Sequence, residues 1–255
     1  MSSKRTAHER FPEVIAAAVR VFTQEGYRAA RMSDVARAAG LSEAALYRYV
    51  ESKEGLFVLA IRHALLLEAM PAEDRDETDA DDGVAGPEGV RFPLKPPPLA
   101  EMISQAREFV AAEVPFGSLA AALSGPVPAD PAAELETVMR ELFTLESQTR
   151  EAADMIERSA RELPELADLL NSGLRRPVLA AMTNYLARRA STGTLRATPD
   201  TAATARLVLE TLTWFARHRY LDPYGAAIPD NLAADTAVDA MIHALVPPHF
   251  LGERP

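Results

Sequence analysis

The residues best suited to chemistry lie close together, between Ser42 and Lys53. Ser42 precedes a short predicted helix as an N-cap, which leaves the positive end of the helix dipole and its free N–H groups exposed to a phosphate. Tyr47, Arg48 and Tyr49 follow on that helix. Phenol and guanidinium groups donate hydrogen bonds to phosphate oxygens, and a guanidinium also pairs with a guanine edge. The pattern favours contact with a nucleic acid.

Three predicted helices must position these groups. A first helix, over residues 11–25, has apolar side chains at helical spacing on one face and should act as a support. Two helices of about two turns follow at 33–39 and 43–49, and helices this short are not stable alone. Gly40 suits the tight turn between them because glycine adopts positive φ readily, and Leu46 should face back into the core.

Composition limits the classes of protein to which the chain can belong. Its 255 residues are 48% hydrophobic, which is enough for a sizeable core, and their net charge is −10. This charge excludes a uniformly basic protein that wraps nucleic acid. Residues 1–55 contain nine basic and seven acidic side chains, so this segment is at +2. The absence of cysteine excludes disulfides, thiolate zinc sites and cysteine nucleophiles.

The remaining pattern predicts an all-α protein, since Ala, Leu, Glu and Arg recur at helical spacing and alternation of period two does not persist. Long helices are expected at 131–161 and 164–190. Residues 71–98 are rich in proline, glycine and acidic side chains, and we expect a flexible insert there. No apolar run has the length of a membrane span or a signal peptide, so we expect a cytoplasmic, nucleoid-associated protein without a membrane partner.

Residues 11–58 resemble the DNA-binding segment of the TetR family of transcriptional regulators. The resemblance rests on VIAAAVRVFTQEGY and MSDVARAAGLSEAALYRYVESKEGLF, which match in order and without gaps. It implies that the helix at 43–49 is a recognition helix in the major groove. The residues it places at the DNA are Arg31, Ser33, Ser42, Ala44, Tyr47, Arg48, Tyr49 and Lys53.

Three positions depart from the family pattern. Arg31 stands where a capping threonine is usual, Glu43 replaces a common lysine, and Val50 replaces a phenylalanine. A carboxylate at Glu43 repels phosphate, although it can accept a hydrogen bond from a cytosine amino group or favour the helix N-terminus. A basic arm formed by the residues Lys4, Arg5 and Arg10 either reaches a minor groove or is disordered.

The resemblance also implies a division into a DNA-binding domain, residues 1–55, and a helical effector-binding and dimerisation domain, residues 56–255. The candidates to line a small-molecule pocket are Met102, Phe109, Met139, Phe143, Tyr185, Trp214 and His218. Six apolar residues are expected either to form a dimer interface or to belong to the core of one chain. They are Leu207, Leu209, Leu212, Val238, Met241 and Leu245.

The function implied by the resemblance is a homodimeric repressor that binds a pseudo-palindromic DNA operator and is released by a small-molecule effector. No catalytic motif stands out, and the five histidines have no paired ligand spacing, so we expect neither an enzyme nor a cofactor nor a metal. Two alternatives stay open. One is a helical ligand carrier or protein-interaction module with a vestigial helix-turn-helix, and the other is an enzyme in the C-terminal body.

Overall fold

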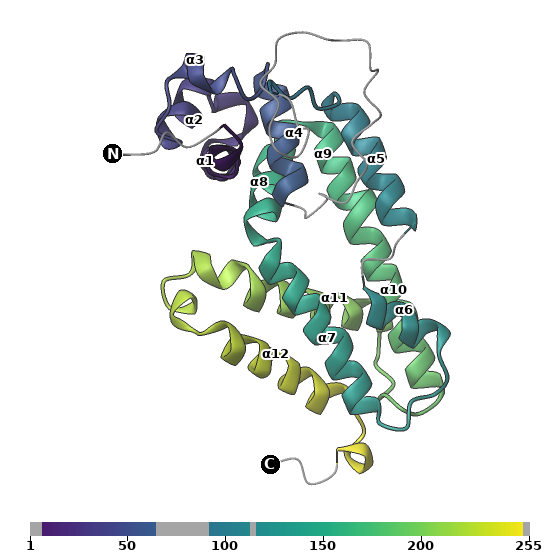
Figure 1. Cartoon of the computed structure of the whole chain (residues 1–255). Helices are drawn as coiled ribbons and strands as arrows, with labels where there is room; N and C mark the ends of the chain where they lie inside the picture. The colour runs from purple at the N-terminus through teal and green to yellow at the C-terminus, as the bar shows by residue number, and fades with distance from the viewer. Residues whose placement is uncertain (1–6, 65–91, 113–115, 252–255) are drawn as a thin grey trace. The chain divides into compact units, whose positions relative to one another are not determined.

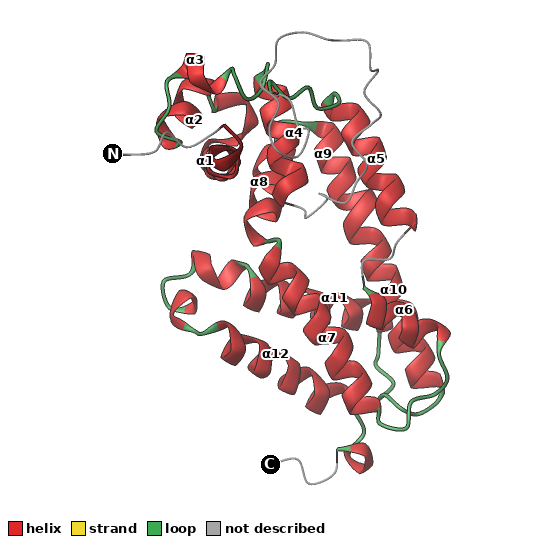
Figure 2. Cartoon of the chain, viewed as in Figure 1, coloured by secondary structure: helices red, strands yellow, loops and turns green. Residues whose placement is uncertain are grey.

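A computed structural model describes residues 7–64, 92–112 and 116–251. The described part is built from helices joined by loops and contains no strand, as Figure 2 shows, which confirms the predicted all-α class. None of the helices in these ranges is long and apolar enough to cross a membrane. The chain divides into two compact units. The N-terminal unit combines Met1–Phe109 with Glu151–Leu170, and the C-terminal unit combines Val110–Arg150 with Asn171–Pro255. The expected functional boundary at residue 55 stays a prediction.

The N-terminal unit begins with the helices of the predicted helix-turn-helix. Its helices are α1 (Ala7–Ala29), α2 (Met32–Ala38), α3 (Glu43–Leu46), α4 (Lys53–Ala64), most of α5 (Leu99–Ala112), α8 (Arg150–Ala160) and α9 (Pro164–Asp168). Helix α1 packs against α2 and α4 (Figure 1). Phe22 of α1 and Phe57 of α4 are both buried, and their rings meet edge to face with centroids 4.9 Å apart. The apolar face predicted for the first helix therefore packs against α2 and α4.

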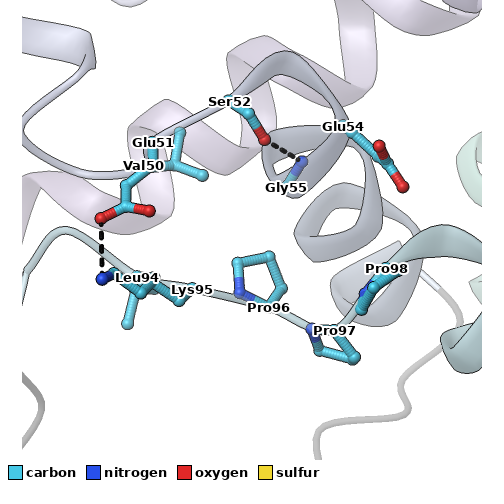
Figure 3. A pocket seen from close by; sticks show the side chains of 10 residues that line it. All are labelled: Val50, Glu51, Ser52, Glu54, Gly55, Leu94, Lys95, Pro96, Pro97 and Pro98. Atoms are coloured by element: carbon cyan, nitrogen blue, oxygen red, sulfur yellow. Dashed lines mark hydrogen bonds and ion pairs between the residues drawn. The ribbon is translucent and has the colours of Figure 1, made fainter.

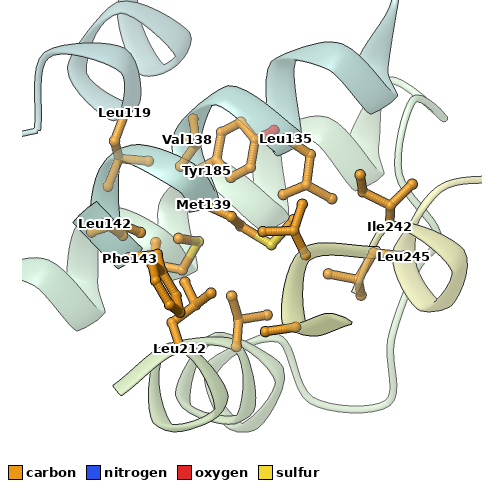
Figure 4. Close-up of a cluster of buried hydrophobic side chains, with 14 of the residues drawn as sticks. Leu119, Leu135, Val138, Met139, Leu142, Phe143, Tyr185, Leu212, Ile242 and Leu245 are labelled. Carbon is orange, nitrogen blue, oxygen red and sulfur yellow. The ribbon is translucent and has the colours of Figure 1, made fainter. Parts of the chain in front are cut away.

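The C-terminal unit is a second helical body with its own core. Its helices are α6 (Gly117–Ser124), α7 (Pro131–Gln148), α10 (Arg176–Ser191), α11 (Thr201–Ala216) and α12 (Asp230–Leu245). Helix α7 packs against α11 and α12, and α10 packs against α6 and α11. Leucine, methionine and aromatic side chains from these helices fill the space between them (Figure 4). Short 3₁₀ turns, at His218–Leu221 and Gly225–Ala227, connect α11 to α12.

Both long helices predicted in the middle of the chain are interrupted. The helix predicted at 131–161 ends at Gln148 and resumes at Arg150 as α8. Between them, the Thr149 hydroxyl donates to the carbonyl oxygen of Leu145 at 2.8 Å, a bond that bends helices. The helix predicted at 164–190 contains a π-helical stretch, Leu169–Arg175, before α10. Pro177 lies in the first turn of α10 and lacks an N–H for the helical ladder.

Candidate DNA-binding site

The turn between α2 and α3 has the geometry that the sequence predicts. Gly40 has a φ of 65°, in the left-handed region that glycine adopts without strain. The N–H of Leu41 donates to the Ala36 carbonyl at 2.8 Å, which closes the end of α2. Arg10 donates from Nη2 to the carbonyl of Ala39 at 3.2 Å. Arg10 therefore supports the turn, whereas Lys4 and Arg5 of the expected basic arm lie outside the described residues.

The recognition helix is shorter than predicted. Helix α3 covers Glu43–Leu46, and its N-cap is Ser42, whose Oγ accepts a hydrogen bond from the N–H of Ala45 at 3.2 Å. Beyond Leu46, the N–H of Tyr49 bonds to the carbonyl three residues earlier, at 2.9 Å. Such bonds tighten the chain into a turn. The predicted cap at Ser42 is confirmed. Residues 47–49, which were predicted to be part of the helix, form a turn directly after it.

Most of the predicted DNA-contacting side chains are exposed. The exposed members of the set are Arg31, Ser33, Ser42, Ala44, Tyr47 and Arg48. Tyr47, a large aromatic side chain, is 41% exposed. The side chain of the N-cap residue Arg31 makes no capping hydrogen bond. Arginine in place of the usual threonine therefore leaves a guanidinium group exposed at the surface. Glu43 is also exposed, in the first turn of α3.

Tyr49 differs from its neighbours. Its side chain is only 7% exposed, and its ring lies 6.4 Å from the Phe11 ring and 5.3 Å from the Phe92 ring, measured between centroids. The ring of Tyr49 thus packs inside, and the predicted contact of its hydroxyl with DNA stays a prediction. The cause is the pair of phenylalanines, one of which lies more than forty residues away in the chain and leaves no local signal in the sequence.

Lys53 has structural partners that sequence reasoning did not find. Its Nζ donates to the carbonyl oxygens of Arg28, at 3.1 Å, and Ala30, at 2.8 Å. It also lies 4.8 Å from the centroid of the Tyr27 ring. Burial lowers the pKa of Lys53, and the charge of Glu162 opposes that shift. The ammonium group thus ties the start of α4 to the connection between α1 and α2. It has three N–H donors, so two carbonyls leave one for another acceptor.

The predicted pocket residues do not all lie together. Three of them, Met139, Phe143 and Tyr185, are buried in the core of the C-terminal unit, where Figure 4 labels them. Met102 is buried in the N-terminal unit. Trp214 is 38% exposed. His218 is half-buried in a 3₁₀ turn, and the side chain of Phe109 lies outside the described residues.

The predicted interface residues divide between core and surface. Leu212, Val238 and Leu245 are at most 5% exposed, so they belong to the core of their own chain. The sequence left this possibility open beside a dimer interface. Leu209 and Met241 are half-buried, and Leu207 is 59% exposed. Other apolar side chains exposed in this part of the chain are Trp214, Tyr220, Leu221, Tyr224 and Leu232.

Comparison with known proteins supports the assignment of the N-terminal segment. Residues 14–60 match the model of the family described as bacterial regulatory proteins, tetR family. Among solved structures, the regulator PfmR from Thermus thermophilus is 22% identical, with a TM-score of 0.52, over 90% of this chain and 97% of its own. AibR in complex with isovaleryl coenzyme A and operator DNA is 15% identical, with a TM-score of 0.51, over 94% and 99%. No curated protein matches the chain.

The fold and this match define the class of protein, an all-helical regulatory protein with an N-terminal helix-turn-helix. Residues 14–60 match the tetR family of bacterial regulatory proteins, which confirms the resemblance of residues 11–58. Proteins of this class are DNA-binding regulators of transcription. In the part of the chain that is described, no group of three or more His, Cys, Asp or Glu side chains has the arrangement of a metal site.

Proposed function

We propose that this protein is a transcriptional repressor that binds a pseudo-palindromic operator as a homodimer and leaves it when a small molecule binds. The observation that supports this most strongly is the capped helix α3, followed by the exposed side chains of Tyr47 and Arg48, within a segment of tetR type. A helix placed in this way enters the major groove with its N-terminal end. Two copies in a dimer then contact two half-sites.

The proposed DNA contacts follow from the exposed groups. Arg48 donates to a phosphate or to a guanine edge, and Tyr47 donates its phenol to a phosphate. Arg31 and Lys53 add cations beside the helix, and Lys53 retains one N–H for a phosphate oxygen. With a net charge of only +2 on residues 1–55, affinity depends on a few contacts that the dimer doubles.

The proposed effector site lies in the C-terminal unit, within the proposed domain 56–255. Met139, Phe143 and Tyr185 meet in its core, and small-molecule sites are mostly apolar with a few polar groups. AibR supports the proposal as a protein of similar fold, solved with isovaleryl coenzyme A and operator DNA. Linkage requires the effector and the operator to weaken each other's binding by the same factor.

Selection of bound duplexes from a random pool by the purified protein tests this function. We expect an enriched inverted repeat, bound at least about a thousandfold more tightly than scrambled DNA. Arg48→Ala should lower the affinity for the selected duplex by at least about fivefold, since a bidentate contact contributes about 1–3 kcal/mol. Arg206 on α11 is also an exposed arginine, so Arg206→Ala is the matched control and should bind as the wild type does.

Failure of the selection would contradict the repressor. Equal binding of selected and scrambled DNA, abolished equally by salt, would favour the ligand-carrier or interaction-module alternative. In that case Arg48→Ala and Arg206→Ala should bind DNA with the same affinity.

A further inference from the structure

A segment outside the family match lies against the recognition helix. Residues 92–98, which we call the strap, follow residues 65–91 and come well after the matched residues 14–60. The Phe92 ring lies 5.3 Å from both the Phe11 and the Tyr49 rings and 4.8 Å from the His8 ring, measured between centroids. The strap therefore packs its first side chain, which is half-buried, between α1 and the turn at residues 47–49.

The backbone of the strap makes a second contact. The N–H of Leu94 donates to the carbonyl oxygen of Tyr49 at 2.8 Å, and Val50 and Leu94 form an isolated parallel β-bridge. Tyr49 ends the turn that follows α3, where a helix leaves its last carbonyls without partners in the helix. The strap thus supplies a hydrogen-bond donor at the end of the recognition element.

The rest of the strap lies along the start of α4 (Figure 3). Pro96 contacts Gly55 so closely that a Cβ on Gly55 would lie 3.1 Å from the proline Cγ. Lys95 pairs with Glu51 at 3.2 Å, and directly after the strap the N–H of Leu99 donates to the Glu54 carboxylate at 2.9 Å. Between the strap and α4 lies an open pocket of about 210 Å³. These contacts hold the strap at several points along its length.

These contacts bear on DNA binding because α3 is so short. A helix of four residues has no stability of its own, so its orientation depends on what it packs against. Tyr47 and Arg48, the proposed DNA contacts, directly precede Tyr49, which the strap holds by its ring and its carbonyl. We propose that the strap positions the recognition helix on DNA and that Phe92 is its main positioning residue. The proposal rests on the DNA-binding function proposed above.

Phe92→Ala tests the proposal in two measurements. The first is affinity for the selected operator, which should fall about tenfold, as expected for the loss of aromatic pairs. The second is amide hydrogen exchange without DNA, which should become faster over residues 43–50 and stay unchanged over α4. Phe92→Leu keeps most of the apolar volume and should recover most of the affinity. Phe250→Ala removes a ring of equal size from the C-terminal unit and should leave operator affinity unchanged.

Each outcome has one meaning. Wild-type affinity in Phe92→Ala would overturn the role of the strap while leaving the proposed function intact. Faster exchange over both residues 43–50 and α4 would also overturn it, because the ring would then stabilise the fold in general. Unchanged hydrogen exchange over residues 43–50 in Phe92→Ala would show that the strap does not hold the recognition helix. A wild-type protein that binds no duplex specifically would instead overturn the proposed function.

Discussion

The Nζ atom of Lys53 lies 2.8 Å from the carbonyl oxygen of Ala30, so the first residue of α4 closes the connection between α1 and α2. A second bond, to the carbonyl of Arg28 at 3.1 Å, strengthens this junction. The connection leads directly into α2 and then to the recognition helix. Lys53, which the family resemblance places at the DNA, is thus also part of the framework that presents the DNA-contacting side chains.

Replacement of Lys53 should therefore affect both stability and DNA binding. Lys53→Met removes two hydrogen bonds from an ammonium group and should lower the free energy of unfolding by about 1–2 kcal/mol, measured by urea denaturation. On operator DNA, the slope of log affinity against log salt should become shallower by about one per subunit. The matched control is Arg206→Met, since Arg206 makes an exposed ion pair with Glu210 that contributes less than about 1 kcal/mol. An unchanged salt slope in Lys53→Met would mean that Lys53 is structural only.

Gly40 provides a test of the turn between α2 and α3. Its φ is 65°, and nothing lies within 4 Å of a Cβ built on it, so Gly40→Ala introduces backbone strain without a clash. Gly193 is its counterpart in the C-terminal unit, with a φ of 73° and the same open space. Each alanine variant should lose about 1 kcal/mol of stability. Only Gly40→Ala should also weaken operator binding, measured by fluorescence anisotropy, because only that turn sets the angle of α3.

Local sequence signals predicted much of the helix-turn-helix. Its supporting helix α1 was found from helical spacing, and its turn and cap were found from Gly40 and Ser42. These features depend on residues within a few positions of each other, which is why one sequence suffices to find them.

The features that sequence reasoning missed depend on distant residues. Phe92 buries Tyr49 from more than forty residues away, and Lys53 meets Arg28 and Ala30 across a helix–helix junction. The strap also falls in a stretch, residues 71–98, whose proline, glycine and acidic content predicted a flexible insert. Proline fits a docked extended chain equally well, because it needs no N–H partner. Composition therefore did not distinguish a docked segment from a flexible one.

A buried ion pair connects helices of the C-terminal unit. The Nε and Nη2 atoms of Arg189 each lie 2.7 Å from a carboxylate oxygen of Glu134, and Nη2 also donates to the Ala122 carbonyl at 2.8 Å. Arg189→Met leaves Glu134 without its partner and should cost about 3 kcal/mol in urea denaturation. The double variant Arg189→Met/Glu134→Leu should recover most of that loss, since neither charge remains buried. A double variant that stays as unstable as Arg189→Met would show that the arginine acts mainly through the Ala122 carbonyl.

The exposed leucine on α11 provides a test of the proposed dimer. Leu207 is 59% exposed, and a large apolar side chain on such a surface is a candidate for contact with a second copy. Leu207→Arg should raise the dimer dissociation constant at least about tenfold in sedimentation equilibrium, because an unpaired charge would enter the interface. Val127 lies in the loop before α7 and is 51% exposed, so Val127→Arg adds the same charge at similar exposure and should leave the dimer intact. Equal dissociation constants for both variants and the wild type would exclude Leu207 from the interface. A wild-type protein that sediments as a monomer at micromolar concentration would instead contradict the homodimer itself, and operator binding would then have to use single half-sites.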